Sequence, residues 1–524
     1  MFRKNHKHKQ PGLFGFQNVI KESMHQEIME SEEYKFYDLI FCKIREEDFS
    51  CLYSERESRP NSPVNSMVCS ILLQYRNNWT FSELRKNIKF NLLTKTALGL
   101  GDLDEVPFSE ATLFNFMKRL SDHEILTGIN LLEKVFDQLT DTQLKELKIR
   151  TNIQRTDSFQ AASNIRKYSR LQFLVEILHR VYRGLSEEDR LHYGDIFSEY
   201  VKKTSGEYVY HLKPEETPIK LSEMVPIFKR VKEEILPGYG MSDTIRIFNR
   251  VYAEHFILDG EGIKLREEGW KSSFLLSPDD EDATFRKKRN TEYRGQVVNL
   301  VETCNPENEI NLLTDVGVYP NNVDDSRILS QRIDNLKLKT PDLEELHGDG
   351  GYPSQKSDKQ LEEQGVRIIQ TAIRRKPTKW IQPEIHKGED GVYTVSCPVQ
   401  KAEAKMSNKR YVAEFAENIC ESCPFSSQCK IQKGKGVRRY YFRETKYLMQ
   451  IRHRAIDELP ESRRTLRSNV EGTVAEFSRK MVKGKLKQRG RFKASVFAYC
   501  SAIVINFGRI FRYLREVSPE MAAN

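Results

Sequence analysis

The 524-residue sequence has no apolar run that approaches the length needed to span a bilayer. Its first residues, MFRKNHKHKQPGLFGF, are basic but lack the apolar segment of a secretory signal. We therefore expect a cytoplasmic protein that does not associate with membranes. Several catalytic signatures are also missing, since there is no G-x-S-x-G, no P-loop and no H-E-x-x-H. Their absence argues against the common serine hydrolases, P-loop NTPases and zinc peptidases.

Cysteines are few, and their distribution is uneven. The chain has nine, an odd number, and four of them crowd between residues 397 and 429. In a reducing compartment such crowding favours a metal site over disulfides. The pair Cys420 and Cys423, together with Cys397 and Cys429, predicts a structural Zn²⁺ site of four thiolates. A cluster of unligated thiols is the alternative.

The composition, with 38% hydrophobic and 30% charged residues, can build cores and does not indicate disorder. The length is enough for about two to four domains. The formal net charge is +9, and the excess is concentrated between residues 430 and 515, where Lys and Arg far outnumber Asp and Glu. Charge clustered in this way indicates a nucleic acid partner more often than a membrane.

Residues 466–493 combine an apolar stripe, an acid and a basic run. The stripe has the spacing of one helix face and consists of Leu466, Val470, Val474, Phe477 and Met481. Glu471 lies at its edge, where a carboxylate is costly to bury unless it is paired or binds a metal. The basic run consists of Lys483, Lys485, Lys487, Arg489, Arg491 and Lys493. We expect a metal site beside a polyanion; the alternative is an Arg467–Glu471 pair with a solvated basic tail.

The spacing of apolar residues also predicts the order of elements. Helical patterns begin after residues 58–65 and after Thr80, and Ser109 is placed to cap a third helix. These short helices suit a helix-turn-helix-like DNA-binding module, and a plain helical bundle fits them equally. Residues 149–156 predict a strand that ends before Asp157, residues 165–285 are mainly helical, and strands alternate with helices from Thr291. This alternation indicates an α/β layer structure.

Three acids are candidates for metal binding. Asp157 follows a predicted strand, glycines flank Asp349, and Glu471 lies on a predicted helix. Such carboxylates can hold two Mg²⁺ or Mn²⁺ ions about 4 Å apart, the arrangement used for in-line phosphoryl transfer. Ordinary turn positions explain Asp157 and Asp349 equally well, and glycine beside Asp349 permits a sharp turn. Rival acids of the same composition are Asp315, Asp324 and Asp325.

Residues 438–454 interleave basic and aromatic side chains. Arg binds phosphates and aromatic rings stack on splayed bases, so we expect DNA contacts from Arg438 and Arg439. Ordinary core aromatics of a strand or helix are the alternative. Residues 373–380 have a similar composition.

In collinear order over most of the chain, these motifs resemble the DDE transposases of bacterial insertion sequences, in the branch with a helical N-terminal domain and a cysteine cluster in the catalytic domain. The resemblance rests on RPNSPVNSMVCSILLQYRNNWTFSELRKNIKF, FSEATLFNFMKRL, RTDSFQAASN, YRGQVVNLVE, YPNNVDDSRIL, HGDGGYPS, CESCPFSSQC and RSNVEGTVAEFSRKMVKGKLKQRGRFK. That collinear order is far more specific than any single motif.

The resemblance implies an α/β, RNase H-like catalytic core in which Asp157, Asp349 and Glu471 hold two divalent metal ions. It further implies binding of the element's terminal inverted repeats, DNA strand cleavage and strand transfer, a homodimer in the synaptic complex, and a place at the bacterial nucleoid. Related transposases often carry Tyr, Arg, Glu and Lys along the last helix. Arg467 and Glu471 fit this pattern, whereas the Tyr and Lys positions hold Arg464 and Ser478.

Either Lys480 or Lys483 takes over the missing phosphate contact, or the four-residue pattern does not apply to this branch. Glu476 is a weaker rival for Glu471. We expect DNA contacts from Arg467, from Lys480 and from the basic run.

The expected domain order is a helical DNA-binding domain (1–125), the start of the core with the first acid (126–164), a helical insertion (165–288), core strands with the second acid (289–380), a Cys-rich basic insertion (381–450) and the catalytic helix with its basic tail (451–516). Two other hypotheses stay open. One is a DNA-binding protein derived from a transposase with an inactive or repurposed centre. The other is a nuclease that cuts DNA without strand transfer.

Overall fold

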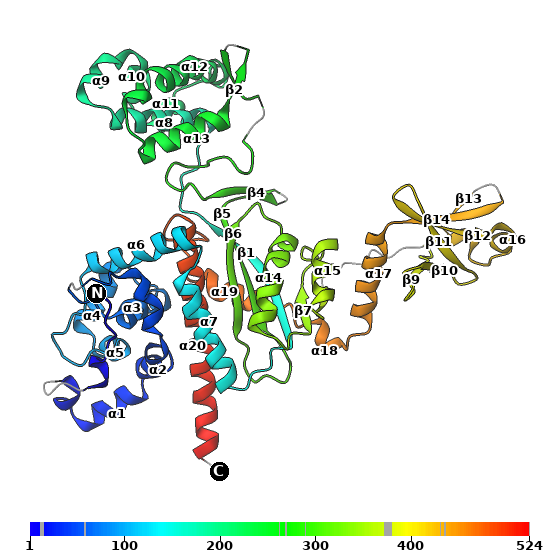
Figure 1. Cartoon of the computed structure of the whole chain (residues 1–524), viewed down its shortest axis with the longest axis horizontal. Helices are drawn as coiled ribbons and strands as arrows, with labels where there is room; N and C mark the ends of the chain where they lie inside the picture. Colours follow the sequence, from blue (N-terminus) through cyan, green and yellow to red (C-terminus); the bar gives the residue numbers. More distant parts are fainter. Residues whose placement is uncertain are drawn as a thin grey trace.

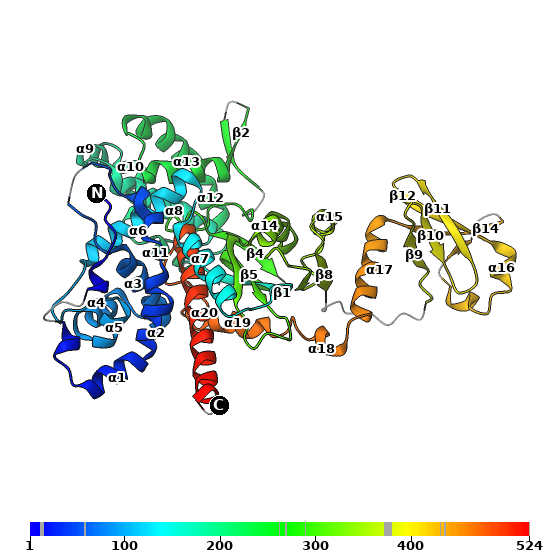
Figure 2. The ribbon, with the colours of Figure 1, turned by 60° about the horizontal axis from the view of Figure 1, so that its bottom comes forward.

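A central sheet with helices on both faces carries three outlying parts: the N-terminal helices, a helical insertion and a small second sheet (Figure 1). A second view, in Figure 2, also shows the small sheet standing well apart from the central one. The computed structural model describes residues 1–10, 15–56, 59–260, 262–267, 270–288, 290–370, 380–429, 431–433 and 436–522. The mixed α/β architecture with a helical N-terminal region agrees with the sequence expectation.

The N-terminal helices begin where side-chain caps are available. They are α1 (Glu22–Glu30), α2 (Glu32–Leu39), α3 (Val64–Asn77), α4 (Phe81–Phe90), α5 (Leu92–Ala97), α6 (Glu110–Thr127) and α7 (Leu131–Glu146). Thr80 and Glu83 form a capping box at the start of α4. The Ser109 hydroxyl accepts a hydrogen bond from the Thr112 backbone N–H, which confirms the expected cap of α6.

The central sheet contains antiparallel and parallel neighbours. Its strands are β1 (Ile153–Ala162), β4 (Thr284–Lys288), β5 (Thr291–Thr303), β6 (Leu313–Pro320), β7 (Glu345–Gly348) and β8 (Arg367–Gln370). The order is β6-β5-β1-β7-β8. The pairing of β1 with β5 ends at Gly295, and β4 pairs with the remaining part of β5, from Gly295 back to Thr291. β1 and β6 each pair with β5 in antiparallel orientation. β7 runs parallel to β1, and β8 runs parallel to β7.

Both faces of the sheet are buried. Val298 and Leu300 of β5 face a core shared with α3, α7, α19 (Val470–Ser478) and α20 (Arg491–Ala522). The next residue, Val301, belongs to a second core with α14 (Asp325–Lys339) and α15 (Gln355–Glu363). The alternation of neighbouring side chains between two faces explains why β5 is apolar along its length.

Helix α20 crosses the middle of the molecule (Figure 1). By length and composition it could cross a membrane, and it is the one such helix among the described residues, so the expectation that no apolar run approaches this length is wrong. However, 83% of its apolar window is buried inside the protein. It is therefore explained as a core helix that the N-terminal helices and the sheet both cover.

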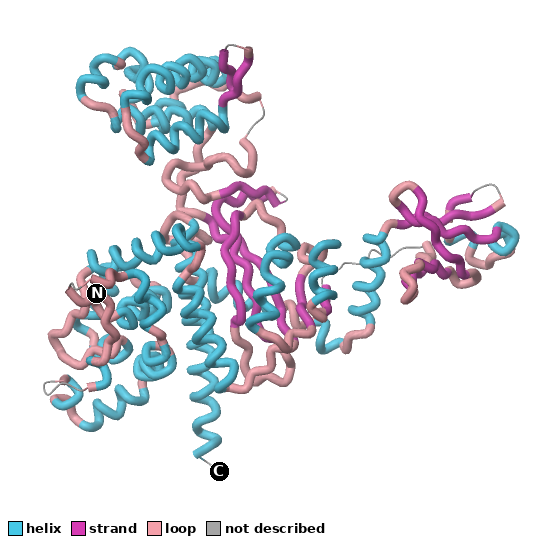
Figure 3. Tube along the Cα trace, viewed as in Figure 1, coloured by secondary structure: helices cyan, strands magenta, loops and turns pink. Residues whose placement is uncertain are grey.

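The helical insertion has a core of its own, separate from that of the sheet. Its elements are α8 (Arg170–Gly184), α9 (Glu187–His192), α10 (Gly194–Val201), α11 (Ser205–Tyr210), α12 (Glu216–Arg230), α13 (Asp243–His255) and the hairpin β2 (Phe256–Asp259) and β3 (Gly262–Leu265). Figure 3 shows that helix predominates in this part. Phe173, Phe228 and Phe248 are fully buried within it. The mainly helical character expected for residues 165–285 is confirmed.

The second sheet was not expected from the sequence. It has the order β13-β14-β12-β11-β10-β9, and all neighbours are antiparallel. Its elements are β9 (Glu384–Lys387), β10 (Tyr393–Ser396), β11 (Lys401–Ser407), β12 (Arg410–Ala416), α16 (Glu417–Glu421), β13 (Gln432–Lys433) and β14 (Val437–Phe442). Helices α17 (Glu444–Asp457) and α18 (Glu461–Arg464) lead back to the central sheet.

The aromatic residues of 438–454 help to build the core of this second sheet. The Tyr393 ring packs against those of Tyr411, Phe442 and Tyr447, and Tyr440 packs against the same core. These rings therefore fit the alternative of ordinary core aromatics better than that of a stacking surface for bases. Of the similar segment 373–380, residues 373–379 lie outside the described residues.

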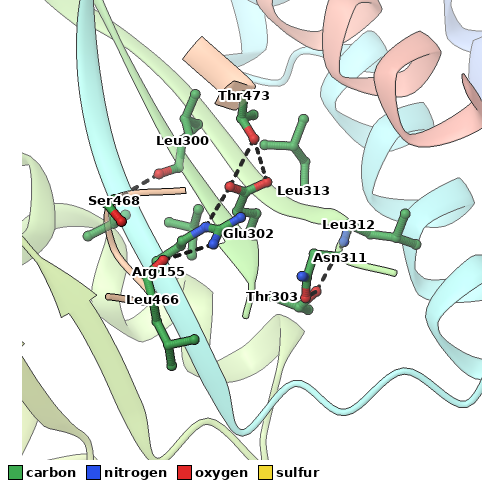
Figure 4. Close-up of polar contacts among 12 residues, drawn as sticks. Arg155, Leu300, Glu302, Thr303, Asn311, Leu312, Leu313, Leu466, Ser468 and Thr473 are labelled. Carbon is green, nitrogen blue, oxygen red and sulfur yellow. Dashed lines mark hydrogen bonds and ion pairs between the residues drawn. The ribbon is translucent and has the colours of Figure 1, made fainter. Parts of the chain in front are cut away.

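A buried ionic cluster joins the sheet to the last two helices. Figure 4 shows the part of it formed by Arg155, Glu302, Leu466 and Thr473. Glu302 of β5 is fully buried and accepts hydrogen bonds from Arg155 Nε at 2.7 Å and Arg509 Nη1 at 2.8 Å. The Thr473 hydroxyl of α19 lies 2.8 Å from the same carboxylate. Arg155 Nη1 also donates to the Leu466 carbonyl at 2.8 Å, just ahead of α19. The cluster thereby fixes α19 and α20 against β1 and β5.

Replacing Glu302 with Gln would leave two buried guanidinium groups without their shared counter-charge. Removal of one partner from a buried ionic cluster costs about 3–5 kcal/mol, so we expect a loss of this size in the free energy of unfolding. Urea denaturation of the full chain measures it. The matched control is Glu307→Gln, which removes an exposed ion pair with Arg150 and is expected to cost at most about 1 kcal/mol. Equal losses in the two variants would show that the cluster does not stabilise the fold.

Candidate functional site

Strand register brings Asp157 and Asp349 together. β1 and β7 are parallel, with Arg155 paired to His347. Two residues further along, β1 reaches Asp157, and the chain that leaves β7 reaches Asp349. β7 ends at Gly348, whereas β1 continues to Ala162. Asp349 therefore follows a strand end as predicted, but Asp157 lies within β1, so the expectation that its strand ends at residue 156 is wrong.

Asp157 is held from both sides by donors. Its Oδ1 accepts the Ser158 backbone N–H at 2.8 Å, and its Oδ2 accepts Arg467 Nη2 at 3.0 Å. Burial nevertheless raises the pKa of Asp157, and the neighbouring Asp349 and Asp325 raise it further against the effect of Arg467. Arg467 thus pairs with Asp157 and not with Glu471, so the alternative of an Arg467–Glu471 helix pair is not what the structure contains.

The glycines around Asp349 provide space. Neither Gly348 nor Gly350 nor Gly351 has a positive φ, so a left-handed turn is not the reason for glycine. A side chain at Gly351 would begin 3.1 Å from Asp349 Oδ1 and 3.1 Å from Asp325 Oδ2. The Gly351 N–H also donates to Asp349 Oδ1 at 2.8 Å. Glycine at residue 351 therefore lets two carboxylates approach the same stretch of backbone.

Asp325, a rival candidate in the sequence, lies near Asp349 at Gly351. It is the first residue of α14, and burial raises its pKa, with a further contribution from Asp349. The other two rivals have different roles. Asp324 is exposed and pairs with Arg286 at 3.3 Å. Asp315 is fully buried, and Arg332 and Lys339 lower its pKa to about 2 although burial opposes them.

Glu471 lies in the first turn of α19 and is exposed, in contrast to the half-buried position expected from the stripe. Among the described contacts its carboxylate has no hydrogen bond or ion pair. Four residues earlier, Arg467 binds Asp157, so the start of α19 is tied to β1. The rival Glu476 pairs with Arg509 Nη2 at 2.7 Å and is committed to the buried ionic cluster.

Within the part of the chain that the structure describes, no three His, Cys, Asp or Glu side chains are close enough together to hold one metal ion. The acids Asp157, Asp325 and Asp349 offer only carboxylate oxygens as ligands. The donor set of oxygens suits Mg²⁺ or Mn²⁺. One buried oxygen, Asp325 Oδ1, has no hydrogen-bond partner, which fits a site that a cation completes.

For the thiols, the structure does not support the zinc prediction. Cys420 is buried, and Cys397 and Cys429 pack against the same core. Gln400 lies between two of them, donating its backbone N–H to Cys397 Sγ and its amide to Cys420 Sγ, both at 3.2 Å. Burial raises the pKa of the Cys420 thiol, and the neighbouring Cys397 and Cys429 raise it further.

The basic run lies beside β1. The Leu486 backbone N–H donates to the Ala162 carbonyl at 2.8 Å. The loop that contains Leu486 is therefore bonded to the last residue of β1, the strand that carries Asp157. Its exposed basic residues are Lys483, Lys485, Lys487, Arg489, Arg491 and Lys493. Some also have internal partners: Lys487 donates to the Asn78 carbonyl at 3.0 Å and Arg489 to that of Asn164 at 2.7 Å. The loop thus presents positive charge near the acids while anchored to neighbouring elements.

Of three other basic residues expected to contact DNA, two have internal partners and the third is buried. Lys480 Nζ donates to the Tyr75 carbonyl at 3.1 Å, and burial lowers its pKa to about 8. Arg438 is buried in the second sheet, and Arg439 pairs with Glu414 at 2.7 Å. The second sheet stands apart from the central sheet (Figure 1). These placements do not favour direct phosphate contacts by Lys480 or Arg438.

The pKa of Lys480 predicts a pH dependence of stability. Between pH about 8 and its ordinary value of 10.5, the folded chain has released this proton while the unfolded chain still holds it. Folding therefore becomes more favourable as the pH rises through this window. We expect the free energy of unfolding of the native protein to rise relative to that of Lys480→Met, measured by urea denaturation at several pH values. The exposed-site control Lys485→Met should keep a constant difference from the native protein. The same constant difference for Lys480→Met would contradict the assignment.

Comparison with known families gives matches in two regions. A transposase DDE domain matches residues 393–511, which include the second sheet except β9, Glu471 and most of α20. A transposase domain (DUF772) matches residues 25–119 in the N-terminal helices. Neither match covers Asp157, Asp325 or Asp349. No curated protein and no solved structure matches the chain. Both matches are to transposase families, one near each end of the chain, and together they support a DDE transposase of an insertion sequence.

Proposed function

We propose that this chain binds the terminal inverted repeats of its own element and catalyses DNA strand cleavage and strand transfer with divalent metal ions. The observation that carries this proposal is the parallel register of β1 and β7, which brings Asp157 within β1 close to Asp349, the residue after the end of β7. The order β6-β5-β1-β7-β8, with three antiparallel strands followed by two parallel ones, supports an RNase H-like core.

In this proposal Asp157, Asp349 and Glu471 hold two Mg²⁺ or Mn²⁺ ions. When bound, such ions polarise the scissile phosphate and stabilise the attacking and leaving oxygens of an in-line displacement. The chain's own part is to place the carboxylates: β1 and the β7 end fix the first two, and the buried cluster around Glu302 fixes the helix that carries Glu471. No serine or histidine nucleophile is then needed.

The basic run would bind the DNA backbone next to these acids. Four exposed Lys and Arg side chains lie in the loop after α19, which bonds to the end of β1, and two more lie at the start of α20. Cationic segments of this kind bind phosphates without regard to sequence. The Arg467 guanidinium, which lies at 3.0 Å from Asp157, is placed where a scissile phosphate would approach. A homodimer that holds two element ends follows from the need to join both ends in one reaction.

Removing one acid should abolish the chemistry and leave DNA binding intact. We expect Asp349→Asn to lose cleavage of a labelled DNA carrying the element's own end, with Mg²⁺ or Mn²⁺ supplied. Metal ions contribute several kcal/mol to such a transition state, which corresponds to a loss of about a thousandfold or more in rate. Gel electrophoresis of the labelled strand measures cleavage, and electrophoretic mobility shift measures binding.

The matched control is Asp334→Asn, because Asp334 is exposed on the same layer of helices and contacts only Gln364 at 3.1 Å among the described residues. It should cut as the native protein does. Binding without cutting by the native protein, with both metals and paired ends supplied, would favour a DNA-binding protein with an inactive centre. Cutting without joined products would favour a nuclease.

A further inference from the structure

We propose that Asp325 is a fourth carboxylate of the metal site and binds one of the divalent ions directly. This inference rests on the proposed function, because it takes the metal site around Asp157 and Asp349 as given. It goes beyond that function by adding a ligand from α14, an element that lies outside the strands and the helix assigned to the other three acids.

The first support is position. Asp325 Oδ2 and Asp349 Oδ1 each lie 3.1 Å from the point where a side chain at Gly351 would begin. Two carboxylates therefore face one small space that carries no side chain of its own. Like charges this close repel each other, so the arrangement needs a compensating positive charge.

The second support is that no cation among the described residues bonds to Asp325, although Ser158 hydrogen-bonds to it and Arg286 and Lys288 act on it from farther away. Its Oδ1 is buried without a hydrogen-bond partner, and the described residues provide no ion pair to it. The other strongly buried acids differ: Asp315 has Arg332 and Lys339, and Glu302 has Arg155 and Arg509. Buried charges are either paired or coordinate metals. Asp325 has no bonded cation within the described part of the chain, so we infer that it coordinates a metal.

The third support is the contrast with its neighbour in sequence. Asp324 and Asp325 both lie at the start of α14, where the helix dipole favours a carboxylate. The nearby cation, Arg286, pairs with the exposed Asp324 at 3.3 Å and not with the half-buried Asp325. A role in capping the helix or in surface charge would use Asp324, so neither role explains why an acid stands at residue 325.

With a fourth ligand, the site can hold an ion before the exposed Glu471 takes part. The carboxylate of Glu471 is exposed and has no described contact that would fix it. Asp325, by contrast, is held at the sheet on the first turn of a helix packed into a buried core. The ion nearest Asp349 would then be held by two rigid carboxylates, Asp325 and Asp349, before Glu471 engages.

The test is the affinity of the full-length, metal-free protein for Mn²⁺, measured by isothermal titration calorimetry without DNA. We expect Asp325→Asn to weaken Mn²⁺ binding at least about tenfold, since even residues that only orient a ligand cost that much. Asp324→Asn should bind Mn²⁺ as the native protein does, because it changes the same helix start without touching the site. Asp325→Glu, which keeps a carboxylate, should recover most of the affinity.

Thermal unfolding separates a lost ligand from a damaged fold. In metal-free buffer the unfolding midpoint of Asp325→Asn should equal or exceed that of Asp324→Asn, because the substitution removes a repulsive charge. With saturating Mn²⁺ its midpoint should rise less than that of the native protein. If Asp325→Asn proves too unstable to titrate, the affinities of Asp325→Glu and Asp325→Ser provide the same comparison.

The outcomes distinguish this inference from the function on which it rests. Native-like Mn²⁺ affinity in Asp325→Asn, with affinity lost in Asp349→Asn, would overturn the role of Asp325 and leave the proposed function standing. Native-like affinity in both Asp157→Asn and Asp349→Asn would overturn the proposed function itself.

Discussion

The buried carboxylate of Glu302 is the contact on which the arrangement of the core depends. It lies between Arg155 of β1 and Arg509 of α20 and accepts the hydroxyl of Thr473 in α19. A buried acid of this kind is tolerated only with full compensation, so three elements distant in sequence must meet at one point. The start of α19 is fixed as a consequence, and Arg467 and Glu471 are carried with it.

The second constraint is the parallel register between β1 and β7. One pair, Arg155 with His347, determines which residues lie side by side where β7 ends. A shift by one residue would turn the side chain of Asp157 to the opposite face of the sheet. The short β7, with four residues, leaves the neighbouring part of β1 open toward Asp349. The meeting of two acids is thus a product of strand pairing rather than of local sequence.

The basic residues near the end of the chain divide into exposed ones and ones buried inside the protein. The exposed lysines and arginines of the loop after α19 remain available to a polyanion, whereas Lys480, Arg438 and Arg509 are used inside the protein. Counting basic residues along residues 430–515 cannot separate these two groups, because the run alternates between surface and core. The same holds for the aromatic residues of β14, which pack in the second sheet.

Local patterns determined much by themselves: the capped helices α4 and α6, the helical insertion, the acids Asp157 and Asp349 as site candidates, and the family resemblance through collinear motifs. These features depend on neighbours within a few residues or on order along the chain. Only the tertiary structure decided that Arg467 pairs with Asp157, that Asp325 joins the acids and Asp315 does not, and that residues 384–442 form a sheet. Each of those outcomes depends on which acids and which cations become buried next to each other. Contacts between segments far apart in sequence decide this, and local sequence does not reveal them.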